Sequence, residues 1–324
     1  MTRPSDLEAL AALSAKIGAD PMLIQAAGGN TSVKDGDVMW IKASGTLLAE
    51  ALDKDIFVPC NLSAMRDSLT RGEARADQAQ EFALVPGGLR PSIETSLHAV
   101  FPQRVVVHAH CVHTLAHAVQ ADPVAAIGAK LDAFDWGIVP YVKPGANLAG
   151  QVRGVVEQGC DVVVLGNHGI IVAAETAEDA GALLARVFEA LRVVPVPILN
   201  TNLGDVPEGW VIGPAALSYI ALDPVRLAMA TGGSLYPDHV IFCGVGALAA
   251  QTPPDGDTPP FVLIPGQGAL LRADASAGVQ ALAQCLGDVL MRVPEGAALN
   301  YLTLEQNGEL LNWDAEKYRQ ALNA

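Results

Sequence analysis

The chain has 324 residues, a length that suits one large domain or two of moderate size. Hydrophobic residues make up 51% of it and charged residues only 17%, a balance that excludes wholesale disorder. The 20 basic and 35 acidic residues give a formal net charge of -15, so nucleic acid and anionic membrane surfaces are not expected as partners.

Signals for export, membrane insertion and disulfide bonding are all weak. The N-terminal MTRPSDLEALAAL has early charges and no continuous apolar run before a cleavage site, which predicts a cytoplasmic location. The most apolar segments are interrupted by Gly, Asn and His well short of the ~20 residues that a membrane helix needs. Five cysteines without a C-x-x-C pair indicate reduced core thiols rather than disulfides or a zinc knuckle.

The N-terminal part of the chain predicts a helix, a hairpin and a second, short helix. Apolar residues recur at helical spacing over residues 5–17. Residues 30–43 indicate a β-hairpin with its turn at residues 35–37. Residues 92–101 place apolar side chains on one helical face behind Ser92, which we expect to be the N-cap.

The middle of the chain continues this alternation of helices and strands. Residues 105–110 are a β-branched run that ends in histidines, which predicts a strand. Residues 161–172 predict a further strand and turn, and a long helical pattern follows over about residues 178–192. This alternation indicates a layered α/β fold.

Proline density rises over residues 194–214, which marks the best candidate for a domain boundary. We therefore expect a larger N-terminal domain over residues 1–205 and a smaller C-terminal α/β region over residues 206–324.

The C-terminal region repeats a pattern of the preceding one. The sequence FVLIPGQGALLRADASAGVQ, from Phe261, aligns with VVVLGNHGIIVAAETAEDAG, from Val162. The segment HVIFCGVGALAA, from His239, aligns likewise with RVVVHAHCVHTLA, from Arg104. These alignments give the hypothesis of a shortened duplicate without metal ligands, with convergent α/β patterning as the alternative. Three histidines fall opposite other residue types: His108 opposite Cys243, His110 opposite Val245 and His168 opposite Gln267.

The histidines near the middle of the chain are the clearest sign of chemistry. Alternate side chains of a strand face the same side, so His108 and His110 project together. His168 lies in a Gly-flanked turn after another predicted strand. Zinc favours imidazole nitrogens, and three protein ligands leave a fourth position open, as in catalytic sites. These three histidines are our candidate metal ligands, with polar residues at a sheet edge as the alternative interpretation.

Three further histidines lie close by in the sequence. His113 and His117 share one face of a predicted helix, where they could bind a metal themselves or serve surface or packing roles. His98 has the same alternative and carries little weight as a ligand.

Glu94 stands just ahead of the histidine strand, after the turn at residues 91–93. A partly desolvated carboxylate beside a metal can act as a general acid or base. The alternative is a structural role, because the helix dipole stabilises a carboxylate in the first turn. The helix N-terminus and the turns at residues 28–30 and 44–45 offer N–H groups that attract phosphate. Most Gly-rich turns, taken singly, are only turns.

Together these motifs resemble the class II aldolase/adducin family over roughly residues 5–200. The later LYPDHVIFCG, LIPGQGAL and LLNWDAEKYR look like the aldolase portion of the bifunctional rhamnulose-1-phosphate aldolase/alcohol dehydrogenases. The elements that match in family order are GGNTSVK from Gly28, IKASGT from Ile41, PSIETSLH from Pro91, VVVHAHCVHT from Val105 and VLGNHG from Val164.

The resemblance implies a fold and a metal site. The fold is a three-layer αβα sandwich around a mainly antiparallel sheet. Three positions match the family zinc ligands, namely His108, His110 and His168, and Glu94 matches the catalytic acid/base.

The resemblance also implies a phosphate site like that of the fuculose-phosphate aldolases. Ile93 stands where those enzymes often have a second serine, which weakens the match there. Tyr141 is near in sequence to the tyrosine proposed to protonate the aldehyde, but it is not aligned with it. The positions that match the substrate phosphate site are Asn30, Ser44, Gly45 and Ser92.

The implied activity is that of a zinc-dependent aldehyde-lyase of carbohydrate catabolism, which cleaves a ketose phosphate into dihydroxyacetone phosphate and an aldehyde. Another divalent metal, such as manganese, iron or cobalt, suits the same ligands. The family also holds epimerases, dehydratases and non-enzymatic adducins. Epimerases usually carry Asp where Glu94 stands, and the complete ligand set favours an enzyme over a scaffold. Family aldolases are oligomers, so a homodimer or homotetramer is expected.

Overall fold

The computed structural model describes residues 3–197, 203–254 and 259–313. The chain forms two compact units, one within Met1–Cys111 and Gly128–Leu191, the other within Val112–Ile127 and Arg192–Ala324. The predicted domain boundary between residues 205 and 206 stays a prediction. Over the described residues, no helix has the length and apolar character that crossing a membrane requires.

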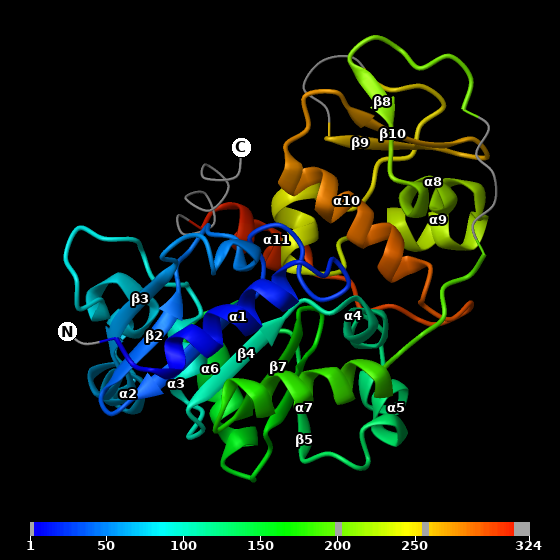
Figure 1. The fold of residues 1–324 in the computed structure, drawn as a ribbon. Helices are drawn as coiled ribbons and strands as arrows, with labels where there is room; N and C mark the ends of the chain where they lie inside the picture. Colours follow the sequence, from blue (N-terminus) through cyan, green and yellow to red (C-terminus); the bar gives the residue numbers. More distant parts are fainter. Residues whose placement is uncertain (1–2, 198–202, 255–258, 314–324) are drawn as a thin grey trace. The chain divides into compact units, whose positions relative to one another are not determined.

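The first unit is built on a seven-stranded sheet with the order β3-β2-β1-β4-β7-β6-β5 (Figure 1). Every neighbouring pair is antiparallel except β5 and β6, so the predicted mainly antiparallel sheet is confirmed. The strands are β1 (Asn30–Asp35), β2 (Val38–Lys42), β3 (Phe57–Asn61), β4 (Val105–Ala109), β5 (Trp136–Val139), β6 (Val162–Leu165) and β7 (Gly169–Ala174).

Helices cover both faces of this sheet, which confirms the predicted three-layer αβα sandwich. On one face α1 (Asp6–Gly18) and α7 (Ala177–Ala190) pack against each other (Figure 1). On the other face α3 (Thr95–Ala99) packs between α2 (Leu62–Arg71) and α6 (Ala146–Val156). Four short 3₁₀ helices complete the described part of the unit: η1 (Leu48–Glu50), η2 (Ala74–Asp77), η3 (Ala79–Phe82) and η4 (Gly128–Lys130).

The predicted elements of this unit form within a few residues of their expected limits. Helix α1 forms because Leu7, Leu10 and Ile17 lie on its buried face. The hairpin forms from β1 and β2, where Gly36 supplies the positive φ of 56° in the turn. The predicted strands are β4, β6 and β7, and the long helical pattern is α7, capped by the Thr176 side chain.

Ser92 does not cap a helix as predicted. Helix α3 begins at Thr95, and its N-cap residue, Glu94, makes no side-chain capping bond. Ser92 instead opens the preceding turn, since its carbonyl oxygen accepts the N–H of Thr95 at 3.1 Å and its Oγ accepts the N–H of Glu94 at 3.2 Å. This local turn competes with the first helical turn and leaves the carboxylate at the start of α3.

The second unit contains the predicted smaller C-terminal α/β region together with Val112–Ile127, which the predicted division assigns to the N-terminal domain. Its antiparallel sheet has three strands in the order β8-β10-β9: β8 (Trp210–Ile212), β10 (Gly268–Arg272) and β9 (Phe261–Ile264). The helices are α4 (Val112–Ala118), α5 (Pro123–Ile127), α8 (Ala215–Leu222), α9 (Pro224–Thr231), the π-helix η5 (His239–Cys243), α10 (Ala277–Leu290) and α11 (Leu304–Leu311).

The predicted repeat agrees with the sheets in part. Strand β10 lies between β8 and β9 as β7 lies between β4 and β6, and both hairpins are followed by a helix. In the first sheet His108 pairs with Ile171, and in the second Ile212 pairs with Leu270. The strand β8 therefore takes the place of β4, with Ile212 where the first sheet has His108. Origin by duplication stays a prediction.

The second half of the predicted alignment is wrong. Residues from His239 were aligned with the strand β4, but they form the π-helix η5. Apolar runs of this length do not distinguish a buried strand from a buried helical segment. The Asp-Pro-Val triplet is a more reliable sequence likeness between the two segments. It stands at the start of α5, from Asp122, and at the start of α9, from Asp223. In both places the aspartate accepts backbone N–H bonds at the start of the helix.

Two predicted features extend beyond the described residues. The proline-rich boundary segment includes residues 198–202, and most of the LLNWDAEKYR motif lies after residue 313. The predicted core position of the cysteines is confirmed for four of the five, which are buried: Cys60, Cys111, Cys243 and Cys285.

Gly169 lets two strands of the first unit approach closely. A Cβ atom at Gly169 would overlap the carbonyl oxygen of Ala109 and lie 3.3 Å from His108 Cε1. Gly169→Ala should therefore lower the free energy of unfolding by about 1–3 kcal/mol in urea titrations. The control is Gly154→Ala, on the exposed side of α6 with open space around its Cα, which should raise it by about 0.5–1 kcal/mol. Equal stability of the two variants would contradict this packing.

Candidate active site

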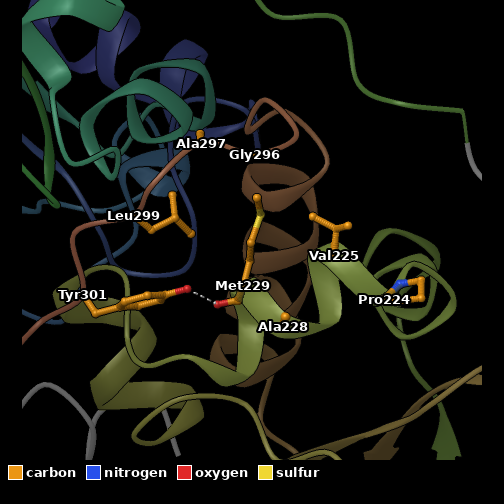
Figure 2. Close-up of a pocket in the computed structure, with 8 residues that line it drawn as sticks. All are labelled: Pro224, Val225, Ala228, Met229, Gly296, Ala297, Leu299 and Tyr301. Atoms are coloured by element: carbon orange, nitrogen blue, oxygen red, sulfur yellow. Dashed lines mark hydrogen bonds between the residues drawn. The ribbon is translucent and has the colours of Figure 1, made fainter.

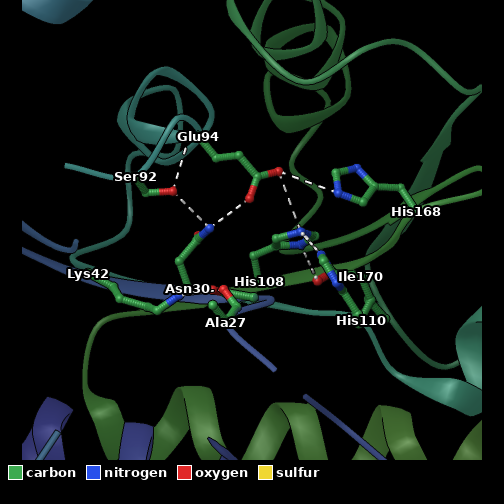
Figure 3. A network of polar contacts seen from close by, with 10 residues as sticks. Ala27, Asn30, Lys42, Ser92, Glu94, His108, His110, His168 and Ile170 are labelled. Atoms are coloured by element: carbon green, nitrogen blue, oxygen red, sulfur yellow. Dashed lines mark hydrogen bonds and ion pairs between the residues drawn. The ribbon is translucent and has the colours of Figure 1, made fainter. Parts of the chain in front are cut away.

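Three buried histidines converge at the end of strand β4 (Figure 3). His108 lies in β4, His110 directly follows that strand, and His168 lies in the turn between β6 and β7. Asn167 gives this turn its shape with a positive φ of 53°, a conformation in which Asn is favoured over most residues. The structure thus brings the three predicted metal ligands together, with one ligand atom of each within 4.8 Å of the others.

The ring nitrogens are arranged as a metal requires. His108 Nδ1 lies 3.0 Å from the carbonyl oxygen of Ile170 and donates its proton there, which leaves the Nε2 lone pair available. His110 Nε2 lies 3.2 Å from His108 Nε2. A tetrahedral zinc ion with bonds of about 2.0–2.1 Å holds its ligands about 3.3 Å apart, so this separation fits.

Glu94 lies against the histidines from the start of α3. Its Oε1 is 3.5 Å from His108 Nε2 and 3.6 Å from His168 Nε2, and it accepts no hydrogen bond from the described residues. Burial is the largest influence on its pKa and would raise it, but electrostatic interaction with the three histidines and the Asn30 hydrogen bond outweigh burial and lower the pKa of Glu94 to about 2. Glu94 is therefore a carboxylate that can accept a proton.

The Asn30 amide holds the Glu94 carboxylate in place, and the Ser92 hydroxyl oxygen accepts bonds from that amide and from the backbone N–H of Glu94. Asn30 Nδ2 donates to Glu94 Oε2 at 2.6 Å and to Ser92 Oγ at 3.1 Å. Asn30 reaches this position because it pairs with His108 across β1 and β4. Both amide protons of Asn30 are thus directed at protein groups, although the sequence resemblance implies a contact with substrate phosphate.

Ser44 and Gly45 lie in the turn after β2, beside the segment that carries Ser92. The N–H of Ser44 donates to the carbonyl oxygen of Arg90 at 2.8 Å, and the N–H of Ser92 donates to the carbonyl oxygen of Lys42 at 3.0 Å. Gly45 has a positive φ of 78°, which suits a glycine turn. The predicted phosphate-site residues of these two segments therefore lie on adjoining stretches of backbone.

Lys42 is a residue that the sequence reasoning missed. It is buried, and its Nζ donates to the carbonyl oxygens of Ala27 at 2.8 Å and Gly29 at 3.0 Å (Figure 3). The available sign was a lysine inside the apolar run VMWIKA, since lysine is seldom fully buried without partners.

The other histidines of the sequence cluster do not join the three ligands. His98 Nδ1 lies 2.8 Å from Ser32 Oγ, and burial lowers the pKa of His98 well below its ordinary value. His113 and His117 lie on α4, in the second unit, where His113 Nδ1 accepts the N–H of Val193 at 3.4 Å. In the described parts of the chain, the one group of three His, Cys, Asp or Glu side chains placed to share a metal is His108, His110 and His168.

A pocket in the second unit offers no comparable chemistry (Figure 2). Its volume is about 500 Å³, and its one titratable side chain, Tyr301, donates its hydroxyl proton to the carbonyl oxygen of Met229 at 2.9 Å. The lining residues are Pro224, Val225, Ala228, Met229, Gly296, Ala297, Leu299 and Tyr301.

The fold, with three convergent histidines beside a carboxylate, is that of a class II aldolase-type domain. Residues 8–194 match the family described as "Class II Aldolase and Adducin N-terminal domain". The chain belongs to this family.

Two known proteins are similar to this part of the chain. The "Uncharacterized oxidoreductase YuxG" of Bacillus subtilis (strain 168) is 31% identical over 192 residues, which are 54% of this chain and 27% of YuxG. The match thus spans about a quarter of that curated relative. The N-terminal class II aldolase domain of a conserved protein from Thermoplasma acidophilum is 27% identical with a TM-score of 0.52, over 59% of this chain and 94% of that domain.

The L-fuculose-1-phosphate aldolase of Thermus thermophilus is also similar, at a lower level. It is 20% identical, with a TM-score of 0.39, over 56% of this chain and 92% of the enzyme. This level supports no functional comparison.

Metal content tests the three histidines directly. Protein purified without a metal-affinity tag and dialysed against zinc should hold about one ion per chain, because one unit has the ligands and the corresponding strand of the other has Ile212 in place of His108. His110→Ala should lose the ion, and the control His117→Gln should keep it. Elemental analysis that finds the ion retained in His110→Ala would contradict the assignment.

Proposed function

We propose that the chain is a divalent-metal-dependent aldehyde-lyase that cleaves a ketose phosphate by a retro-aldol reaction into dihydroxyacetone phosphate and an aldehyde. The observation that carries this proposal is the position of the Glu94 carboxylate, 3.5–3.6 Å from two of three convergent, buried histidines. A metal site with an adjoining carboxylate base suits proton transfer next to a polarised carbonyl.

The residues have separate tasks in this proposal. His108, His110 and His168 would hold the ion, which when bound supplies Lewis-acid polarisation of the substrate carbonyl. Glu94 would exchange the proton at the carbon that becomes the nucleophile in the condensation direction. Its low pKa keeps the side chain ionised at neutral pH, the form in which a carboxylate can accept a proton.

The phosphate would bind beside this centre. Ser44 and Ser92 lie on adjoining backbone and would offer their hydroxyl groups to an anion, and Gly45 would offer its N–H group; the N–H groups of the two serines already bond carbonyl oxygens. Asn30 borders the same site, with its amide protons bonded to Glu94 and Ser92. Zinc as the natural metal, assembly into a homodimer or homotetramer, and a cytoplasmic location belong to the same proposal.

Product analysis tests the reaction. Metal-loaded protein should convert at least one member of a panel of ketose 1-phosphates into dihydroxyacetone phosphate, measured by a coupled reductase assay. Mass spectrometry should show two shorter carbon fragments, because cleavage divides the chain of carbon atoms. A product that keeps all the carbon atoms of the substrate would instead identify an epimerase or a dehydratase. If none of the tested sugar phosphates is converted, a non-enzymatic scaffold is favoured.

Glu94→Gln tests the proton-transfer role. The amide keeps the shape of the side chain but cannot accept the proton, so kcat should fall about 10²- to 10⁴-fold while the protein keeps its metal. The control is Glu157→Gln at the exposed C-terminus of α6, which should have the kcat of the wild type. Full activity of Glu94→Gln would exclude this residue as the base.

A further inference from the structure

We propose that Lys42 is a positioning residue of the active site, which fixes the loop of residues 27–29 so that Asn30 holds Glu94 against the histidines. This inference rests on the proposed function for its catalytic consequence, but its structural part can be tested without turnover. It starts from the two hydrogen bonds of the Lys42 ammonium group, to the carbonyl oxygens of Ala27 and Gly29.

Lys42 acts from the opposite face of the sheet. In β2 the side chain of Ile41 packs in the core cluster with Met65 of α2, so Lys42, the next residue, faces the other way. Ser32 pairs with Ile41 across the hairpin, and Asn30 shares its face because it lies two residues away in the same strand. Lys42 therefore lies away from the Glu94 side, and its influence must pass through the backbone.

The loop that Lys42 holds has an unfavourable backbone conformation. Ala26 has a positive φ of 48°, a rare value for a residue other than glycine, and Gly29 has a φ of 59°. Gly29 also approaches strand β4 closely, since a Cβ atom there would lie 2.8 Å from the carbonyl oxygen of His108. Such a conformation persists only where surrounding contacts hold it.

An ammonium group suits this task. Its three protons can bond two converging carbonyl oxygens at once, and its positive charge strengthens each bond. The two carbonyls flank Gly28, and that of Gly29 directly precedes Asn30, so they fix the direction in which the chain enters β1. The apolar side chain of a methionine of similar length would leave both carbonyls without this donor.

Lys42 is also joined to the second residue that holds Glu94. Its backbone carbonyl accepts the N–H of Ser92 at 3.0 Å, while Ser92 Oγ accepts a bond from Asn30 at 3.1 Å. One residue thus ties both Asn30 and Ser92 by its side chain and its backbone. Figure 3 shows the network from Lys42 and Ala27 at one end to Glu94 and the histidines at the other.

The test compares Lys42→Met with Lys34→Met. Lys34 is the matched control, since it is also buried in the hairpin and its Nζ also bonds a carbonyl oxygen, that of Gln103 at 2.7 Å. In Lys42→Met, hydrogen exchange of the amides of residues 26–30 should rise at least tenfold, while metal content stays at about one ion per chain. The value of kcat should fall about 10- to 100-fold, more than KM rises. Lys34→Met should leave loop exchange and kcat unchanged.

The outcomes separate the two proposals. If loop exchange is faster in Lys42→Met but the wild type cleaves no ketose phosphate, the proposed function is wrong and the positioning role is supported. Unchanged loop exchange and kcat in Lys42→Met would overturn the positioning role. If Lys42→Met does not fold, Lys42→Gln, which keeps one NH₂ donor, is measured in the same way. If both variants unfold, Lys42 stabilises the whole unit, and this result would also overturn the positioning role.

Discussion

The site depends on the pairing of strand β4 with β1 on one side and β7 on the other. This pairing sets His108 between Asn30 and Ile171 in a single row of the sheet. Because neighbouring side chains in such a row share a face, Asn30 and His108 both face the layer that contains α3, whose N-cap residue is Glu94. A shift of β4 by one residue would turn His108 to the opposite face and remove the site.

Much of this arrangement could be predicted from the sequence. The spacing of His108 and His110 on a strand and the place of His168 in a Gly-flanked turn predicted three side chains that the structure brings together. Glu94 was predicted from its place just ahead of the histidine strand, and the family resemblance supported all four residues. The sequence could not predict that the amide protons of Asn30 would bond Glu94, because strand register is a long-range property. Nor could it predict the role of Lys42, which depends on carbonyl groups that any residue types could present.

Errors arose where local signals compete. Ser92 has the side chain of an N-cap, yet its turn precedes the helix, so the helix begins later than the capping rule predicts. The apolar segment from His239 has the composition of a strand and forms a π-helix. The strand β8, with Ile212 in place of His108, has the position in its sheet that β4 has in the first sheet. The three candidate metal ligands therefore belong to the first unit, and the second has a similar strand order without them.

The proposed metal site consists of three imidazoles that bind one ion beside a carboxylate. X-ray absorption spectroscopy of the zinc-loaded protein tests it most directly, because the spectrum reports the identity and distance of the ligand atoms. The spectrum should show three imidazole nitrogens at about 2.0–2.1 Å from the zinc ion, with oxygen as the remaining ligand. Sulfur at about 2.3 Å, which would place the ion at cysteines, or a spectrum without imidazole scattering, would contradict it.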